Sequence, residues 1–328
     1  MKVAVYHNNN NVRLEERPKP KINDGEILVK IISSGICGTD VMEWYRAKKE
    51  PRVLGHEISG EIVECNKVKN FKVHDRVFVT HHVPCNNCKY CLEDNHTACE
   101  ALHTGNFDPG GFSELVRVPK INVDNGTFLL PDNVSYEEGT FIEPVACVVR
   151  AHRVISLKKH HKVLVLGSGV SGLLNIMHAK HIGAEVTATD IDNYKLKKAE
   201  EFGADKVINA KSYFECKADK IIVCTGVMGA VKQAFGNIDR KGTILLFAIP
   251  QEDIKLPNLD IWRNEITITS SYGAAPKDLQ ESLDLIKNKK INVNGLVTHR
   301  FSLKDIGKGF KLAAKPDNSL KVIIEPNK

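Results

Sequence analysis

The sequence predicts an α/β protein with two parts, a β-rich part and a doubly wound parallel sheet, and three observations predict it. The first half consists of short apolar runs separated by Gly, Pro, Asn and Asp turns, with no long amphipathic helix before about Ser135. From Lys162 onward, strand-like and helix-like segments alternate, which is typical of βαβ units and a parallel sheet. A Gly-rich turn, Gly167-Ser-Gly169-Val-Ser-Gly172, joins the first strand and helix of this series.

The first half of the chain is expected to form a compact, barrel-like β domain. Runs such as residues 27–32 and 75–80 are apolar, rich in β-branched side chains and bounded by turn residues. The tail from Asn292 returns to strands punctuated by Pro and Gly, so we expect it to complete this first domain. The predicted boundaries are 1–147 with 291–328 for the β domain, and 148–290 for the parallel-sheet domain.

The second half supplies the strands and helices of the parallel sheet. Helices are expected at residues 170–182 and 193–202. The segment 210–219 is too short for a full crossover helix, so we expect only a stub there. The predicted strands are 162–167, 185–190, 206–209, 220–224, 243–247 and 265–270.

Length and composition exclude several classes of protein. The 328 residues are enough for two domains, and 42% hydrophobic with 26% charged residues is ordinary for a globular protein. No apolar run reaches the roughly 20 residues that span a bilayer, and the first residues have the pattern of a strand and not of a signal peptide. Nine cysteines, four of them clustered with metal spacing, fit a reducing compartment. We therefore expect a cytoplasmic protein with no membrane partner.

The net charge of +6 at pH 7 is modest for this length. The densest basic segment, Lys195-Leu-Lys197-Lys198, lies in an amphipathic helix that also carries Glu200 and Glu201, so we interpret it as a solvated helix face. A nucleic-acid surface requires Lys and Arg clustered on one face. No nucleic-acid partner is therefore expected.

Cys85, Cys88, Cys91 and Cys99 form the most informative cluster of the sequence. Four thiolates in so short a segment fit one tetrahedral Zn²⁺ with no open position, which is the pattern of a structural site. We therefore predict a structural zinc lobe over residues 82–100. A zinc-ribbon nucleic-acid binder is an alternative, but a ribbon has two separated Cys-x₂-Cys pairs, and the spacing here differs.

The Gly-rich turn is expected to bind a dinucleotide. Gly167 permits the tight turn after the strand, Gly169 lets the backbone approach the pyrophosphate, and Gly172 allows close packing of helix on strand. Val170 and Ser171 open the helix, whose N-terminus supplies N–H donors and a positive dipole end.

An acidic residue follows this turn at the distance typical of the motif. Asp190 ends the next predicted strand, about 20 residues further on. Its carboxylate suits both ribose hydroxyls and repels a 2′-phosphate, which favours NAD over NADP. Lys195 lies close by in the sequence and is expected either to flank the adenosine ribose or to soften that rejection.

A second, scattered set of ligand-type residues consists of Cys37, His56, Glu57 and Glu143. Thiolate, imidazole and carboxylate together suit zinc with one position open for water or substrate. Taken singly, each residue has an ordinary interpretation as a buried or surface side chain. Spacing alone does not join ligands that lie so far apart in the sequence.

The motifs around these residues occur in the order of a known family. They are Gly-Ile-Cys37-Gly-Thr-Asp, Leu-Gly-His56-Glu57, the four-cysteine lobe, Gly110-Gly111-Phe, Ile-Glu143-Pro and Gly-Ser-Gly-x-x-Gly. The sequence resembles the zinc-dependent medium-chain dehydrogenases over essentially its whole length, in particular the sorbitol (L-iditol 2-) and threonine 3-dehydrogenase branch. The resemblance implies a GroES-like catalytic domain, a Rossmann domain, two Zn²⁺ per chain and an NAD cofactor.

The resemblance also implies roles for single residues of the metal site. Cys37, His56 and Glu57 match ligands of the catalytic zinc. Glu143 matches either the fourth ligand or the residue that holds the zinc-bound water. Thr39 matches the hydroxyl that takes the alcohol proton and relays it to the cofactor ribose.

Three further positions are expected at the cofactor. Lys321 matches a basic position that reaches the cofactor, and Thr225 and Ser271 fall at strand ends that border the nicotinamide.

The sequence departs from the family pattern at Met42, where many relatives carry the His that finishes the proton relay. Because methionine transfers no proton, we expect a water chain, or His7 or His82, to substitute, or the relay to stop at the ribose.

The function expected from the resemblance is hydride transfer from a secondary alcohol, such as a polyol or sugar alcohol, to NAD. Threonine 3-dehydrogenase and a catalytically silent NAD-binding protein are the alternatives.

We also expect a homo-oligomer, a tetramer in preference to a dimer, with the strand at residues 265–270 pairing at the sheet edge. Candidates for the substrate pocket are the apolar Trp44, Phe107 and Ile249 and the polar Glu43, Arg46, Asn106 and Glu143.

Overall fold

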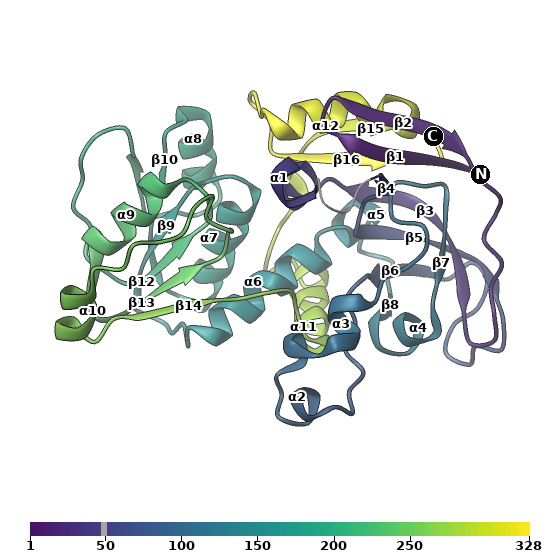
Figure 1. The fold of residues 1–328 in the computed structure, drawn as a ribbon, viewed down its shortest axis with the longest axis horizontal. Helices are drawn as coiled ribbons and strands as arrows, with labels where there is room; N and C mark the ends of the chain where they lie inside the picture. The colour runs from purple at the N-terminus through teal and green to yellow at the C-terminus, as the bar shows by residue number, and fades with distance from the viewer. Residues whose placement is uncertain (47–50) are drawn as a thin grey trace. The chain divides into compact units, whose positions relative to one another are not determined.

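The structure is a computed structural model that describes residues 1–46 and 51–328 (Figure 1). Its backbone forms two compact units, one of Met1–Pro144 with Ala274–Lys328 and one of Val145–Gly273. We call the first the β-rich unit and the second the parallel-sheet unit. The predicted fold class, an α/β protein with a β-rich part and a doubly wound parallel sheet, is confirmed.

The described residues of the β-rich unit form two sheets. Their strands are β1 (Lys2–Asn8), β2 (Asn11–Glu16), β3 (Ile27–Gly35), β4 (Arg52–Val53), β5 (Glu57–Cys65), β6 (Arg76–Thr80), β7 (Leu115–Val118), β8 (Thr127–Leu129), β15 (Val297–Ser302) and β16 (Lys321–Glu325). The larger sheet follows the order β15-β16-β3-β5-β6-β8, with β7 paired to β3, and the smaller follows β2-β1-β4. The pairs are antiparallel except β15 with β16.

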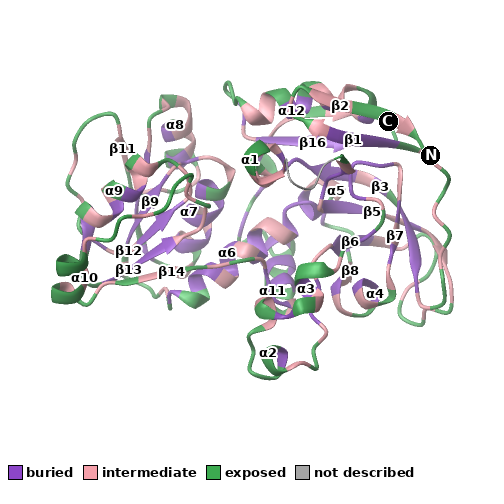
Figure 2. Cartoon of the chain, viewed as in Figure 1, coloured by how far each residue is buried: buried purple, intermediate pink, exposed green. Residues whose placement is uncertain are grey.

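The core of this unit forms because side chains alternate along the strands, so that one face of each is apolar. In Figure 2 the strands β3, β5 and β6 are largely buried. Burying each large aliphatic side chain stabilises the unit by about 1.5–3 kcal/mol. The buried cluster across these strands consists of Ile27, Val29, Ile31, Ile58, Ile62, Val77, Val79, Phe107, Val116, Val118 and Val123.

The β-rich unit also contains seven helices among the described residues. They are α1 (Glu43–Arg46), α2 (Lys89–Leu92), α3 (Glu100–Thr104), α4 (Lys120–Gly126), α5 (Tyr136–Gly139), α11 (Pro276–Lys287) and α12 (Ile306–Ala314). Helix α12, which the sequence analysis did not predict, packs its Phe310 against Tyr6 of β1, with ring centroids 5.2 Å apart. Short 3₁₀ turns lie between them, including one at Gly38–Val41.

The second boundary between the units differs from the predicted one. The sequence analysis places residues 274–290 in the parallel-sheet domain. The structure places α11 in the β-rich unit, where the hydroxyl of Ser282 donates to the carbonyl of Ile142 (2.7 Å). Asn133 Nδ2 likewise donates to the carbonyl of Lys287 (2.9 Å) at the end of the same helix.

The parallel-sheet unit has the six strands that the sequence predicts. They are β9 (Lys162–Leu166), β10 (Glu185–Asp190), β11 (Lys206–Asn209), β12 (Ala218–Val223), β13 (Ile238–Leu246) and β14 (Thr267–Ser270). They follow the order β11-β10-β9-β12-β13-β14, and all pairs are parallel. This is the doubly wound order, in which ligands bind beyond the carboxyl ends of the central strands.

The helices of this unit are α6 (Ile142–Val154), which begins in the β-rich unit, α7 (Val170–Ile182), α8 (Asn193–Glu201), α9 (Met228–Asn237) and α10 (Asn258–Asn264). No helix lies in residues 210–217, where Phe214 and Cys216 pack against the sheet instead. Strand β14 begins two residues later than predicted because Glu265 adopts left-handed backbone (φ 51°) at the end of α10. Within the described part of the chain, no helix is long and apolar enough to cross a membrane.

Candidate metal and cofactor sites

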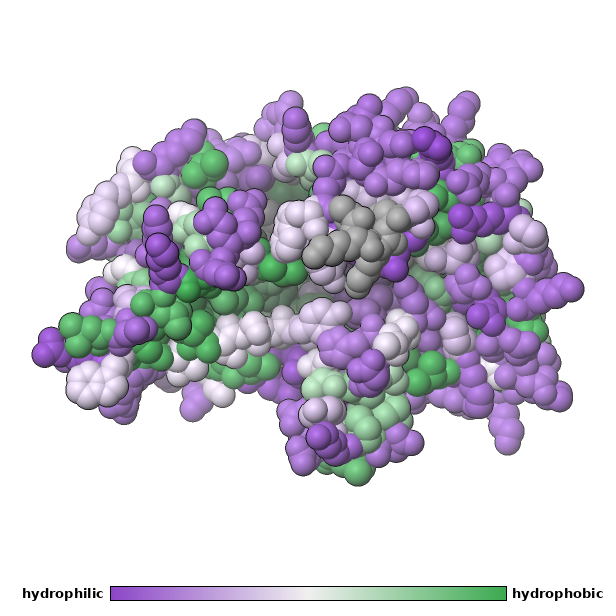
Figure 3. Space-filling model, in the orientation of Figure 1, coloured by the Kyte–Doolittle hydropathy of each residue, from purple (hydrophilic) through white to green (hydrophobic). Residues whose placement is uncertain are grey.

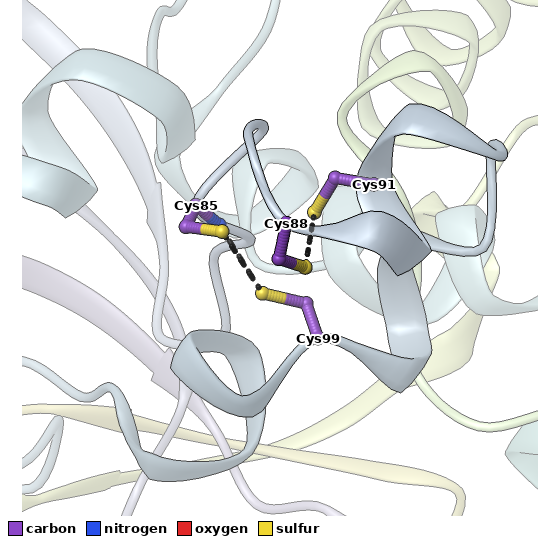
Figure 4. Close-up of side chains that lie close together, drawn as sticks. All are labelled: Cys85, Cys88, Cys91 and Cys99. Carbon is purple, nitrogen blue, oxygen red and sulfur yellow. Dashed lines mark hydrogen bonds between the residues drawn. The ribbon is translucent and has the colours of Figure 1, made fainter.

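The four clustered cysteines point their sulfur atoms toward one centre (Figure 4). Cys85 Sγ lies 3.5 Å from Cys99 Sγ, and Cys88 Sγ lies 3.6 Å from Cys91 Sγ. Four sulfurs about 2.3 Å from a central Zn²⁺ form a tetrahedron with edges of about 3.8 Å. The cluster therefore fits zinc, and all four cysteines are free of disulfides.

Short helices position these thiols. Cys88 precedes α2 and Cys91 lies within it, while Cys99 precedes α3. Burial and the neighbouring thiols raise the pKa of Cys91 to about 12. Burial also opposes ionisation of Cys99, but backbone N–H donors from Cys85 and Leu102 outweigh it and lower the pKa of Cys99 to about 6. Without a metal, the lobe therefore favours the ionised form of Cys99 over that of Cys91. A cation bound at its centre would favour the thiolate form of all four cysteines.

A second group brings together Cys37, His56 and Glu57, whose ligand atoms lie within 4.8 Å of one another. Strand register explains the meeting. Gly35, at the end of β3, pairs with Glu57, at the start of β5, so the residues just beyond these strand ends are neighbours. Glu143, in the first turn of α6, is half-buried and is not part of this group of three.

Asp40 is a buried carboxylate beside this group that the sequence analysis did not name. It is fully buried, its Oδ2 accepts from the backbone N–H of Cys37 (3.0 Å), and its Oδ1 lies 3.5 Å from His56 Nδ1. With Nδ1 turned toward Asp40, Nε2 of His56 is left for a metal. The sequence signal was the spacing Cys-x-x-Asp, in which Asp40 occupies the third position of a 3₁₀ turn and reaches back to its start.

The charges of Asp40 and its neighbours are coupled. Burial raises the pKa of the Asp40 carboxyl, but His56 and Arg46 outweigh that effect and hold the pKa below its ordinary value. Burial lowers the pKa of His56, while Asp40 and Cys37 raise it well above its ordinary value. Asp40 therefore stays ionised and orients the imidazole.

Arg46 holds Thr39, the expected proton acceptor. Its Nε donates to the carbonyl of Thr39 (2.9 Å) and its Nη2 donates to Thr39 Oγ1 (3.2 Å). Nη2 also pairs with Asp40 Oδ1 at 3.3 Å. The hydroxyl of Thr39 in turn donates to Cys37 Sγ (3.3 Å). Arg46, expected in the substrate pocket, thus contacts the metal group through Thr39 and Asp40.

Lys321 has a protein partner that the sequence analysis did not name. The sequence analysis expects it at the cofactor, whereas the structure pairs its ammonium group with the carboxylate of Glu57 in a buried ion pair. The reason is topological, because β16 runs antiparallel to β3 and pairs Ile323 with Gly35, which in turn pairs with Glu57 at the start of β5. The ammonium group also lies 5.7 Å from the ring centroid of Phe141.

Several histidines lie near the metal group. The ring of His81 lies 4.8 Å from that of His56 and 3.7 Å from that of His82, measured between centroids. Burial, the neighbouring His82 and His56, and Arg46 keep the pKa of His81 well below its ordinary value. His7 Nε2 is buried and has no hydrogen-bond partner among the described residues.

The remaining pocket candidates have varied environments. Phe107 is buried in the core of the β-rich unit, so its role there is packing. Trp44 of the β-rich unit and Ile249 of the parallel-sheet unit are exposed. Glu43 accepts from the backbone N–H of Asn9 (2.8 Å), and Asn106 caps the N–H of Phe107 (2.8 Å).

The Gly-rich turn between β9 and α7 has the shape that a dinucleotide requires. Gly167 has φ +96°, which only glycine adopts readily, and a Cβ on Gly172 would lie 2.9 Å from the carbonyl carbon of Gly167. A Cβ on Gly169 would meet nothing within 4 Å. The turn is therefore open at the glycine that is expected to face the pyrophosphate, and Val170 and Ser171 follow as the first residues of α7.

Asp190 lies at the carboxyl end of β10, as predicted, and is tied to the turn. Its Oδ2 accepts from the N–H of Ser168 (2.8 Å) and its Oδ1 accepts from the N–H of Asp192 (3.0 Å). These two donors orient the carboxylate and leave its other lone pairs for ribose hydroxyls. Lys195 lies half-buried on α8, which follows.

Two residues expected beside the nicotinamide follow strands of the same sheet. Thr225 comes after β12, and its Cβ would lie 3.2 Å from a Cβ built on Gly167. Ser271 comes after β14, and its buried Oγ has no hydrogen-bond partner among the described residues. The open glycine, the oriented carboxylate and this unpartnered hydroxyl fit a nicotinamide dinucleotide.

Comparison with known proteins places the chain in a family. Residues 23–127 match the family model for the alcohol dehydrogenase GroES-like domain, and residues 171–288 match that for zinc-binding dehydrogenases. Sorbitol dehydrogenase of Mus musculus is 32% identical over 345 residues, which cover 98% of this chain and 96% of that protein. The chain belongs to the zinc-dependent medium-chain dehydrogenases, which are oxidoreductases that use zinc and a nicotinamide cofactor.

Solved structures agree with this assignment. The 2R,3R-butanediol dehydrogenase from Bacillus subtilis has a TM-score of 0.87 and 28% identity, with 99% of each chain covered. A Sinorhizobium meliloti protein solved with bound NADP has a TM-score of 0.88 and 26% identity, again with 99% of each chain covered.

Proposed function

We propose that this chain oxidises a secondary alcohol, a polyol or sugar alcohol, by passing hydride from its carbinol carbon to NAD. The observation that carries the proposal is the group of Cys37, His56 and Glu57 beside the hydroxyl of Thr39. One thiolate, one imidazole and one carboxylate suit a zinc ion with an open position. The sorbitol dehydrogenases among the relatives support a polyol as the substrate.

The metal site has a simple division of labour in this proposal. Zinc held by these three residues would supply a Lewis acid that lowers the pKa of the bound alcohol. Asp40 fixes the orientation of His56, and Glu143 serves as the fourth ligand or as the holder of the ligand water. A second zinc, bound by the four-cysteine lobe, stabilises the fold and takes no part in the reaction.

Thr39 is the group that handles the proton. In the proposal its Oγ1 accepts the proton of the alcohol and passes it to the cofactor ribose. Arg46 keeps Oγ1 in place through its 3.2 Å hydrogen bond. Met42 carries no proton, so the relay beyond the ribose proceeds through water or through His7 or His82.

Asp190 selects the cofactor in this proposal. Its carboxylate is oriented by the N–H groups of Ser168 and Asp192 and accepts the two adenosine ribose hydroxyls. A 2′-phosphate at the same place is repelled by the negative charge, so NAD is favoured over NADP. Lys195 flanks the ribose, while Thr225 and Ser271 border the nicotinamide.

We also propose a homo-oligomer, a tetramer in preference to a dimer. Strand β14 is an edge strand of the parallel sheet, and an open edge is a template for pairing with a second copy. Beside it in the sequence, Leu256, Leu259 and Trp262 are exposed around α10. In Figure 3 apolar side chains show at the part of this unit where α10 lies. Light scattering that shows a monomer rejects this part of the proposal.

The test of the function is NADH formation by zinc-loaded protein with polyols, sugar alcohols, threonine and simple secondary alcohols, with NADP⁺ run in parallel. Turnover of a polyol with NAD⁺ supports the proposal. Turnover of threonine alone supports threonine 3-dehydrogenase. Binding of NADH and of two zincs with no turnover supports the silent alternative.

A further inference from the structure

Three buried polar side chains of the parallel-sheet unit form a chain of hydrogen bonds between α6 and α7, and none of them belongs to the site described above. It consists of Asn175 and His178 on α7 and His152 on α6. Asn175 is fully buried, and His152 and His178 are 2% and 4% exposed. Without competing water, each hydrogen bond of the chain is stronger and each unmade bond is more costly.

The direction of every hydrogen bond in this chain follows from one carbonyl group. Asn175 Nδ2 donates to the carbonyl oxygen of Ser171 (2.8 Å), which is an acceptor only. Asn175 Oδ1 therefore faces His152 Nε2 (2.9 Å), and that nitrogen carries a hydrogen. A neutral His152 then accepts at Nδ1, so His178 Nδ1, 2.8 Å away, is the donor. The two histidines hold the amide of Asn175 in one orientation.

The same amide connects the Gly-rich turn to the segment that follows β12. Ser171 lies in the first turn of α7, whose N–H groups are expected to hold the pyrophosphate. Asn175 Nδ2 also reaches Cys224 Sγ (3.6 Å), 49 residues further along the chain. Cys224 directly precedes Thr225, and burial raises the pKa of its thiol, so the sulfur stays protonated and neutral.

A second contact joins the same two segments. A Cβ built on Gly167 would lie 3.2 Å from Thr225 Cβ and 3.4 Å from the carbonyl carbon of Cys224. The backbone N–H of Cys224 donates to the carbonyl of Leu166 (2.8 Å), the last residue of β9. Two contacts therefore hold the Gly-rich turn near the end of β12. One is the backbone hydrogen bond from Cys224 to Leu166, and the other is made by the amide of Asn175.

We propose that Asn175 is a positioning residue of the cofactor site, which sets the spacing between the first turn of α7 and the corner at Cys224 and Thr225. His152 and His178 support it by fixing the orientation of its amide. The inference rests on the cofactor site proposed above, and it concerns cofactor affinity and not the chemistry at the metal. Removing the amide leaves only the backbone contact between the two segments and weakens dinucleotide binding.

The experiment titrates purified, zinc-loaded protein with NADH by fluorescence and compares the dissociation constants of variants. Asn175→Leu keeps the approximate volume and removes both amide functions, and we expect it to weaken NADH binding about tenfold. The KM of the alcohol and the zinc content stay unchanged. Ile176→Val is the matched control, because it trims a fully buried side chain of the same helix without touching the chain of hydrogen bonds.

A second pair of variants tests the chain if Asn175→Leu does not fold. His152→Leu leaves the amide of Asn175 without its support, whereas His152→Gln restores a donor to Asn175 Oδ1 and an acceptor for His178. We expect several-fold weaker NADH binding for the first and near wild-type binding for the second.

Two outcomes overturn the inference, and they are distinguishable. If wild-type protein binds NADH and Asn175→Leu or, failing that, His152→Leu binds it within twofold, the chain is packing alone. The same conclusion follows if Ile176→Val weakens binding as much as Asn175→Leu. If wild-type protein binds neither NADH nor NADPH, the proposed cofactor site is wrong and the inference falls with it.

Discussion

Lys321 and Glu57 form an ion pair that is almost closed to solvent, although 264 residues separate them in the sequence. Their side chains are 3% and 2% exposed. Gly35 makes room for the pair, since a Cβ at that position would lie 2.6 Å from Lys321 Cε. The pair therefore joins the last strand of the chain to a carboxylate of the proposed catalytic metal site.

Removing one partner of this pair is expected to destabilise the β-rich unit. In zinc-free protein, Lys321→Met leaves the Glu57 carboxylate buried without a counter-charge, which costs about 3–5 kcal/mol in the free energy of unfolding. Adding Glu57→Gln to that variant removes the uncompensated charge and recovers most of the loss. Urea unfolding of the two single variants and the double variant measures the coupling. Additive losses would show that the two side chains do not interact.

The two cysteine sites are expected to respond differently to serine. Cys37→Ser removes a ligand of the catalytic site, so turnover is lost while the fold is kept. Cys91→Ser opens the four-cysteine lobe and lowers the unfolding temperature, because zinc bound there contributes to folding. Zinc analysis should give one ion per chain fewer than wild type in each case. Equal activity of both variants would reject the zinc assignments.

Arg46 is expected to affect turnover through Thr39. Arg46→Met removes the donor to Thr39 Oγ1 and the partner of Asp40, and we expect kcat to fall about ten- to a hundredfold. Arg46→Lys keeps the charge but loses the planar group that contacts Thr39 twice, so we expect an intermediate kcat. Steady-state kinetics at saturating alcohol measures both. If kcat is unchanged in Arg46→Met, Arg46 does not position Thr39.

Asp190 is expected to control the choice of cofactor. Asp190→Asn keeps an oxygen acceptor for one backbone N–H and removes the negative charge that repels a 2′-phosphate. We therefore expect kcat/KM with NAD⁺ to fall about tenfold and the preference for NAD⁺ over NADP⁺ to shrink. Glu185→Gln, at the opposite end of the same strand, is the control for a lost carboxylate. An unchanged ratio of the two cofactors in Asp190→Asn would contradict the assignment.

The buried His178 is expected to make the free energy of unfolding depend on pH. Burial, with a smaller contribution from His181, lowers the pKa of His178 to about 4. The unfolded chain binds this proton near pH 6.5, so stability is unaffected above that pH and falls as the pH drops toward 4. The loss reaches about 3 kcal/mol, at about 1.4 kcal/mol per pH unit.

The measurement is the free energy of unfolding by urea between pH 4 and pH 7. His178→Asn keeps a donor toward His152 and does not titrate, so it should reduce the slope. Part of the slope remains, because burial also holds the pKa of His152 well below its ordinary value. His181→Asn, on the exposed side of α7, should leave the slope in place. Identical slopes for wild type and His178→Asn would mean that other groups dominate.

The sequence predicts local features well and distant pairings poorly. The six parallel strands, the glycine turn and Asp190 were predictable because each depends on neighbours in the chain. The cluster of Cys37 and His56 was predictable only through family resemblance, since strand register brings it together. The partner of Lys321 was not predictable, because it depends on how the last strand enters the sheet. Residues 274–290 were assigned to the other unit, because the local pattern of a segment does not show which unit it packs against.

The order in which the chain is synthesised has a consequence for how this protein matures. The parallel-sheet unit is one continuous stretch, Val145–Gly273, and all of it emerges from the ribosome ahead of α11 and β16. The β-rich unit stays open until then, because β16 is the strand that lies between β15 and β3. Since domains generally fold as units during synthesis, the parallel-sheet unit is complete first. Glu57 lacks its ion-pair partner until Lys321 emerges. A chain that stops a few residues early therefore keeps every proposed zinc ligand and still lacks the strand that closes the sheet around them.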